Sequence, residues 1–134
     1  MKVLVFGTYD ILHKGHLFFL KKAKSFGKEL FVVVALDETV LKLKKRLPKN
    51  NELKRVENIK KLNFVDDAIL GNKDDKYKVI EELNPNVIVL GYDQFSFTSG
   101  LEVELENRGL IVKIIRINES LNPKKYKSSI LRND

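Results

Sequence analysis

The chain has 134 residues, of which 43% are hydrophobic, so it is long enough for one compact domain with its own core. It contains no cysteine, which excludes disulfides, thiolate zinc sites and thiol nucleophiles. No apolar stretch approaches the roughly 20 residues that a membrane span requires, and no signal-peptide pattern precedes the first strand-like run. We therefore expect a single cytoplasmic domain over residues 1–134, without membrane contact.

The formal net charge of +7 is carried by residues 42–61, here called the basic segment. This segment holds nine lysines and arginines and two glutamates, and the charges of the remaining residues cancel. Such a block attracts phosphate, whether in a nucleic acid, a lipid headgroup or a small nucleotide. A solvated helix face rich in lysine explains most of these charges equally well, so composition alone does not choose between the two.

The first elements predicted along the chain are a strand, a helix and a second strand. Residues 3–6 form a short apolar run that ends at Gly7, as expected of a strand buried on both faces. Residues 17–26 have apolar side chains at helical spacings and Gly27 as a stop signal. Residues 30–36 are the clearest buried strand in the sequence.

The middle of the chain predicts two helices and a short strand. Asp37 is expected to cap a short helix that runs to about Lys44. Residues 45–50 form a loop around Pro48, and residues 68–70 form the next strand. The helix between them has an apolar stripe made of Leu53, Val56, Ile59 and Leu62.

The last third of the chain continues the alternation of strands and helices. A helix that ends before Pro85 is marked by Tyr77, Ile80 and Leu83. Residues 87–90 and 111–117 are predicted strands. Between them, residues 101–106 alternate between apolar and acidic side chains, which by period alone favours a strand. We predict a helix there, because Glu and Leu favour helices and Gly109 is typical of a helix end.

Repeated strand–helix units predict a parallel sheet with right-handed crossovers. The expected fold class is α/β, a single Rossmann-like domain with a mostly parallel sheet of about five strands and helices on both faces. Ligands bind outside the carboxyl ends of such strands. The segments at those ends start with residues 7–16 and include residues 91–99.

Residues 7–16 read Gly-Thr-Tyr-Asp-Ile-Leu-His-Lys-Gly-His and contain both histidines of the chain. A strand end, a glycine turn and a helix N-terminus together make an anion site, because free backbone N–H groups and the helix dipole point outward. His13 and His16 are three residues apart, so a helix start can aim both imidazoles at one phosphate. Gly15 between them lets the phosphate approach the backbone.

Other interpretations of this pair remain open at the level of sequence. A histidine at a helix start is often an incidental surface residue. Zinc would require a third protein ligand, and with no cysteine we expect no metal held by the protein. A phosphohistidine would divide a transfer into two steps, but an acceptor phosphate oxygen is already a competent nucleophile.

The ten residues resemble the GT(F/Y)D…HxGH signature of the cytidylyltransferase-like nucleotidyltransferases. This family includes glycerol-3-phosphate cytidylyltransferase, phosphopantetheine adenylyltransferase and the archaeal FAD synthases. The likeness covers nearly the whole chain. Residues 91–94 (Gly-Tyr-Asp-Gln) resemble the family's G(D/Y)D segment near the nucleotide, and residues 126–131 (Tyr-Lys-Ser-Ser-Ile-Leu) resemble its ISTTxI motif.

Two further features are more similar to the archaeal FAD synthases than to the cytidylyltransferases. Residues 44–48 (Lys-Lys-Arg-Leu-Pro) lie where those synthases carry a K-G-R-P-P-like loop, and Arg55 lies where the following helix usually has an arginine. The run at 90–94 is not followed by the tryptophan typical of cytidylyltransferases. The chain departs from the family pattern at Lys45, Leu47 and Lys127, and the RTEG stretch is missing.

The resemblance implies in-line attack by an acceptor phosphate oxygen on the α-phosphorus of a nucleotide, with pyrophosphate leaving. His13 and His16 would be the catalytic residues, and Mg²⁺ would be held mainly by the nucleotide. Asp10 is expected to brace the turn rather than bind metal. The acceptor phosphate would lie against Thr8, Lys45 and Arg46. The implied nucleotide-binding residues are Gly7, Thr8, Tyr9, His13, Gly15, His16, Asp93, Ser128 and Ser129.

The leading substrate expectation from this resemblance is transfer of AMP from ATP to FMN. The enzymatic alternative is transfer of CMP from CTP to glycerol 3-phosphate or another alcohol or sugar phosphate. A different class is a nucleic-acid-binding module that uses the basic segment, although the sequence offers no recognised nucleic-acid motif. A catalytically silent nucleotide sensor is a further alternative, and family analogy suggests a homodimer.

Overall fold

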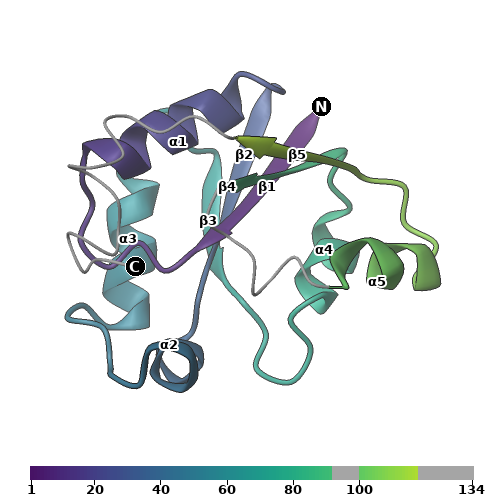
Figure 1. Cartoon of the computed structure of the whole chain (residues 1–134). Helices are drawn as coiled ribbons and strands as arrows, with labels where there is room; N and C mark the ends of the chain where they lie inside the picture. Colours follow the sequence, from purple (N-terminus) through teal and green to yellow (C-terminus); the bar gives the residue numbers. More distant parts are fainter. Residues whose placement is uncertain (92–99, 118–134) are drawn as a thin grey trace.

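The structure is a computed structural model that describes residues 1–91 and 100–117. Strands and helices alternate along this part of the chain, as the sequence predicts (Figure 1). The elements in chain order are β1 Lys2–Gly7, α1 Lys14–Lys24, β2 Glu29–Val34, α2 Asp37–Lys44, α3 Glu52–Lys60, β3 Asp67–Leu70, α4 Lys78–Leu83, β4 Val87–Gly91, α5 Leu101–Asn107 and β5 Lys113–Ile117.

The strands form one parallel sheet in the order β3-β2-β1-β4-β5. Strand β1 pairs with β2 along its whole length, from Lys2 opposite Glu29 to Gly7 opposite Val34. In Figure 1, α1 and α3 lie on one face of the sheet and α4 and α5 on the other. The predicted fold class is therefore confirmed.

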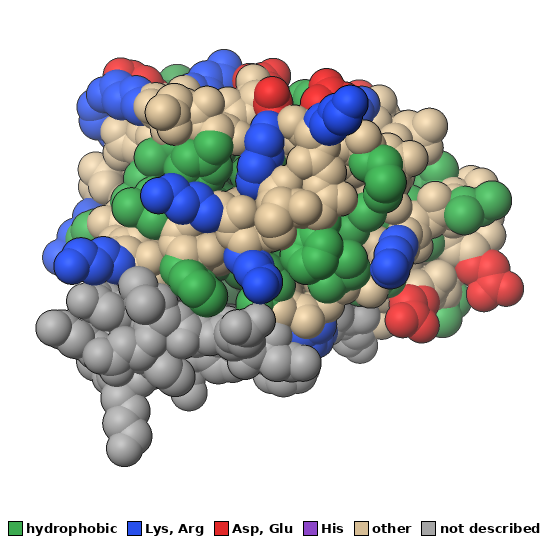
Figure 2. Space-filling model, turned by 90° about the horizontal axis from the view of Figure 1, so that it is seen from above, with side chains coloured by type: hydrophobic (Ala, Val, Ile, Leu, Met, Phe, Trp, Pro, Cys, Tyr) green, Lys and Arg blue, Asp and Glu red, His purple; other side chains and the backbone are tan. Residues whose placement is uncertain are grey.

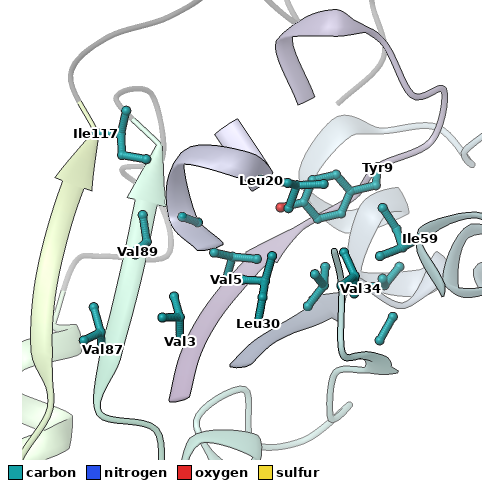
Figure 3. Packing of buried hydrophobic residues seen from close by; sticks show 14 residues of the cluster. Val3, Val5, Tyr9, Leu20, Leu30, Val34, Ile59, Val87, Val89 and Ile117 are labelled. Atoms are coloured by element: carbon teal, nitrogen blue, oxygen red, sulfur yellow. The ribbon is translucent and has the colours of Figure 1, made fainter. Parts of the chain in front are cut away.

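The side chains of each central strand alternate between the two faces of the sheet, so the core has two layers. Val3 and Val5 of β1 pack on the α1–α3 face, and Leu4 and Phe6 pack on the α4–α5 face. Figure 3 shows the first layer, in which the ring of Tyr9 points among the aliphatic side chains beside Leu20. Burial on both faces is the reason why these strands read as continuous apolar runs.

Several boundaries differ from the sequence prediction. Helix α1 begins at Lys14, before the predicted start at residue 17. The N-cap of α2 is Leu36 and not Asp37, so the predicted cap is wrong. Strand β5 begins only at Lys113, and Ile111 before it is 97% exposed. None of the helices within residues 1–91 and 100–117 is long and apolar enough to cross a membrane.

The apolar stripe predicted for α3 is only partly correct. Ile59 is fully buried, but Leu53 is 69% exposed. The helix buries Arg55 completely instead. The first turn of α3 therefore does not pack on an apolar surface, and only its later turns reach the core.

On the α4–α5 face, the guanidinium of Arg108 joins three carboxylates. Its Nη2 donates to both oxygens of Asp75 at 2.9 Å, its Nη1 to Glu81 at 2.7 Å and its Nε to Glu104 at 2.8 Å. The side chain also lies over the ring of Tyr77, with the guanidinium carbon 5.7 Å from the ring centroid. These contacts tie α4 to α5, and the hydrogen bonds from Arg108 hold the pKa of the Asp75 carboxyl below its ordinary value of 3.8.

This lowered pKa predicts a specific acid sensitivity. Because the folded protein binds this proton less readily than the unfolded chain, the interaction stabilises the fold above pH 3.8 and is lost as the pH falls through the lower folded pKa. We expect Asp75→Asn to lower the free energy of unfolding at neutral pH, and the difference from wild type to shrink below pH 3.8. Urea unfolding across this range measures it, with the exposed neighbour Asp74→Asn as control. A difference that stays constant with pH would contradict the assignment.

Candidate active site

The strand order places the end of β1 at the topological switch point of the sheet. From the central strand β1 the chain passes to β2 on one side, and β4 occupies the other side. In an open parallel sheet the crevice at such a point, outside the carboxyl ends of the two strands, is where ligands bind. The turn after Gly7 and the end of β4 at Gly91 border this crevice. Residues 7–16, chosen from the sequence, therefore lie where the topology predicts a site.

The turn after β1 is shaped by Tyr9, which the sequence predicted as a nucleotide contact. Its φ of 53° lies in the left-handed region, which is uncommon for a bulky residue. The side chain is buried in the core, and its hydroxyl donates to the carbonyl of Phe6 at 3.4 Å. A Cβ at position 7 would lie 2.6 Å from the tyrosine ring. Gly7 is therefore required by the space that the ring of Tyr9 occupies.

His13 and His16 cap α1 reciprocally. The Nδ1 of His13, the N-cap residue, accepts a hydrogen bond from the backbone N–H of Gly15 at 3.0 Å. The backbone N–H of His13 donates in turn to the Nδ1 of His16 at 3.3 Å. The two rings are stacked, with 3.8 Å between their centroids. This is the capping-box arrangement with imidazole nitrogens in the place of the usual oxygens.

The capping hydrogen bonds determine what the two rings can offer to a ligand. Because each Nδ1 accepts a backbone N–H, the neutral form of each ring carries its proton on Nε2. Both Nε2–H groups are therefore hydrogen-bond donors. The ring of His16 is held from the side by Tyr9, with 5.4 Å between the ring centroids. The packing thus fixes the tautomer and the position of the rings together.

The first turn of α1 also lacks the acidic residues that would compensate the helix dipole. The first turns of α2, α3 and α5 all carry such residues, including Asp37, Glu52 and Glu102. The positive end of α1 is therefore left for an anion from outside the helix. Together with two Nε2–H donors, it suits the binding of a phosphate group.

Asp10 connects this turn to the α2–α3 loop. Its carboxylate oxygens accept hydrogen bonds from the backbone N–H groups of Lys49 and Asn50, both at 2.8 Å. The side-chain amide of Asn50 donates to the backbone carbonyl of Asp10 at 2.7 Å. The prediction that Asp10 braces the turn is confirmed, and the brace extends to a loop about 40 residues away in sequence.

This loop contains the residues predicted to bind an acceptor phosphate. Lys45 and Arg46 are both exposed, and Lys45 ends α2 with a left-handed φ of 63°. Glycine is favoured at this position of a helix end, because it has no Cβ to clash with the following carbonyl. The lysine therefore holds an unfavourable backbone conformation next to the predicted site.

The structure divides the basic segment. Lys60 and Lys61 lie near Asp67 and Glu57, at 3.7 and 3.6 Å, and Arg55 is fully buried. Figure 2 shows Lys and Arg side chains spread over the face of the molecule that it presents, not gathered in one patch. Many of the positive charges in the basic segment are therefore solvated or paired with carboxylates. The portion of the segment that contacts the turn after β1 is the α2–α3 loop.

The structure brings together His13, Gly15 and His16 at the start of α1, directly after Gly7, Thr8 and Tyr9. The predicted contacts Asp93, Ser128 and Ser129 lie outside the described residues. Sequence reasoning counted Arg55 in the basic segment and noted that an arginine is usual at this place in the archaeal FAD synthases, but it missed that the side chain is buried. Residues 1–91 and 100–117 contain no group of three or more His, Asp or Glu arranged to hold a metal ion.

Residues 4–134 match the protein family described as cytidylyltransferase-like. The FAD synthase of Aciduliprofundum boonei is 44% identical over 119 residues, which are 89% of this chain and 79% of that protein. The FAD synthase of Thermococcus sibiricus is 39% identical over 133 residues, or 98% of this chain and 86% of that protein. The crystal structure of the lipopolysaccharide core biosynthesis protein from Thermoplasma volcanium superposes with a TM-score of 0.83 at 40% identity, covering 89% of this chain and 97% of that chain.

The left-handed conformation at Lys45 predicts a gain in stability from glycine. We expect Lys45→Gly to raise the free energy of unfolding by about 0.5–1 kcal/mol, since the strain relieved exceeds the entropy that glycine adds to the unfolded chain. Lys42→Gly, an exposed site inside α2, is the control and should lower it by about 1 kcal/mol. Denaturant unfolding measures both, and two changes of the same sign would contradict the interpretation.

Proposed function

The chain belongs to the cytidylyltransferase-like family and is a nucleotidyltransferase, and we propose that it is an FAD synthase, which transfers AMP from ATP to FMN and releases pyrophosphate. The identity to FAD synthases over 89% or more of the chain supports the choice of substrates. The site supports the chemistry, because two imidazole donors meet at the uncompensated N-terminus of α1.

In the proposed reaction, a phosphate oxygen of FMN attacks the α-phosphorus of ATP. A new P–O bond forms, the bond from the α-phosphorus to the bridging oxygen breaks, and pyrophosphate takes the electron pair. Negative charge grows on the oxygens around the α-phosphorus and on the leaving group. The Nε2–H groups of His13 and His16 and the backbone N–H groups of the turn donate hydrogen bonds to this charge.

The acceptor side of the reaction is assigned to the α2–α3 loop. Lys45 and Arg46 are exposed there, and the loop is joined to the turn before the histidines by the hydrogen bonds of Asp10. A guanidinium grips a phosphate through two parallel hydrogen bonds, so Arg46 is the residue we assign to the phosphate of FMN. Thr8, which follows the strand end, would contact the same phosphate or the α-phosphate.

Mg²⁺, when bound, would neutralise charge on the triphosphate. The described residues offer no cluster of carboxylates and histidines for it, and both oxygens of Asp10 already accept backbone N–H groups. These observations support a cation carried by the phosphates of the nucleotide. The residues of this chain then bind and orient the phosphates around it.

A direct assay tests the proposed substrates. The purified protein is incubated with ATP and FMN, or with CTP and glycerol 3-phosphate, and FAD and pyrophosphate are quantified. We expect equal amounts of FAD and pyrophosphate from the first pair and no pyrophosphate from the second. If only the pair of CTP and glycerol 3-phosphate releases pyrophosphate, the substrate assignment is overturned and the transferase chemistry stands.

The double role of the histidines predicts variants that separate the cap from the chemistry. Asparagine at position 13 and glutamine at position 16 can still accept the capping N–H groups but offer no imidazole Nε2–H. We expect His13→Asn and His16→Gln each to lower kcat by about 10²–10³-fold. Their free energy of unfolding should stay within about 1 kcal/mol of wild type.

His13→Ala is the matched control, because it removes the cap together with the donor. It should lose activity to the same extent and lose in addition about 1 kcal/mol of stability. Steady-state kinetics and thermal unfolding of the three variants measure both effects. A His13→Asn enzyme with the turnover of wild type would show that the imidazole Nε2–H of His13 is not required for the reaction.

A further inference from the structure

The guanidinium of Arg55 beside the site is a buried polar group with no exposed surface. Its Nη1 donates to the carbonyls of Thr8 at 2.9 Å and Ala35 at 2.8 Å. Its Nε donates to the carbonyl of Asn50 at 3.0 Å, and its Nη2 to Oδ1 of Asp37 at 2.7 Å. One side chain thus joins three segments of the chain: the turn at Thr8, the start of α2 at Ala35 and Asp37, and the loop at Asn50.

These positions belong to the two sides of the proposed reaction. Thr8 lies in the turn that leads to the histidines, which would bind the nucleotide. Asn50 lies in the loop of Lys45 and Arg46, which would bind the acceptor phosphate. Ala35 follows β2, the strand that pairs with β1 along its whole length. Arg55 therefore contacts both the turn assigned to the nucleotide and the loop assigned to the acceptor phosphate.

We propose that Arg55 is a positioning residue, which fixes the distance between the nucleotide-binding turn and the acceptor loop. This inference rests on the proposed function and adds a residue that touches neither substrate. In-line transfer is sensitive to such positioning, because a misplacement of about 1 Å can cost about 10²-fold in rate.

The chemistry of the four contacts requires arginine. Three of the acceptors are backbone carbonyls in different directions, and only a planar guanidinium fork reaches them at once. Lysine has one nitrogen and cannot span them. The positive charge of the guanidinium is paired with the carboxylate of Asp37, whose side chain is 30% exposed. The buried cation is therefore not left without a counter-charge.

Asn50 is hydrogen-bonded to both Asp10 and Arg55, so the position of the loop relative to the turn is fixed. Its carbonyl accepts from Arg55, and its backbone N–H and side-chain amide donate to Asp10. Asp10 in turn follows Thr8 and Tyr9 in the nucleotide-binding turn. The loop is therefore joined to the turn in two ways, through Asp10 and through Arg55. The phosphoryl group would move between these two segments.

Arg55→Lys tests the inference, with Arg108→Lys as matched control. Both arginines make four or more side-chain hydrogen bonds, but Arg108 ties α4 to α5 on the other face of the sheet. We expect Arg55→Lys to lower kcat by about 10²-fold and to raise KM for FMN, with the Kd for ATP unchanged. Arg108→Lys should lose stability without any change in kcat.

Kinetics are compared at a temperature at which circular dichroism shows both variants folded. Equal kcat values for the two variants would overturn the inference and assign Arg55 to stability alone. If Arg55→Lys does not fold, Asp10→Asn loosens Asn50 from the other side without leaving a buried cation. The inference requires a lower kcat with unchanged ATP affinity there too, and a folded Asp10→Asn enzyme with normal kcat would refute it.

The wild-type assay separates this inference from the proposed function. If wild type forms no FAD but releases pyrophosphate with CTP and glycerol 3-phosphate, the substrate assignment fails, and the same variants are compared with that pair. If wild type forms FAD and Arg55→Lys behaves like Arg108→Lys, only the positioning role fails.

Discussion

The carboxyl ends of β1 and β2 depend on one buried cation. At these ends the chain leaves the sheet, so the carbonyls of Thr8 and Ala35 point away from the regular ladder and need donors from elsewhere. Arg55 supplies both from a neighbouring helix. Burying a charge for this purpose contributes less stability than a well-packed apolar side chain would. The guanidinium adds a second set of hydrogen bonds between the turn after β1 and the α2–α3 loop, beside those of Asp10.

Each histidine of the pair also serves two purposes. A cap with aspartate would satisfy the start of α1 equally well, but would leave no donor for a ligand. Imidazole has two nitrogens, so one caps the helix and the other carries the proton. The absence of acidic residues from the first turn of α1 then has a clear meaning, since a carboxylate there would compete with the phosphate for the same positive field.

The fold and the chemistry of the first turn could be predicted from the sequence, because both depend on local patterns. Apolar runs give the strands, and the ten residues after β1 carry the signature in full. The role of Arg55 could not, since hydrophobic periodicity turned Leu53 inward and left the arginine to solvent. The first turn of α3 lies over open strand ends instead of the apolar sheet, and only the tertiary structure creates the need for buried donors there. The left-handed conformation of Lys45 was not predicted, although the residue stands where the resembled loop carries glycine.

Phosphoryl transfer between two phosphates needs little covalent help from a protein, since the nucleophile and the leaving group are already charged oxygens. The protein has to bring the two negatively charged phosphates together and hold the attacking and leaving oxygens in line. This division matches the part of the chain that the structure describes, in which the two imidazoles proposed to bind phosphate offer hydrogen-bond donors. It also explains why Asp10, at the centre of the motif, has both oxygens turned to backbone N–H groups. A free carboxylate beside two phosphates would raise the barrier, whereas the same carboxylate bound to the loop backbone would help to keep the proposed acceptor near the α-phosphorus.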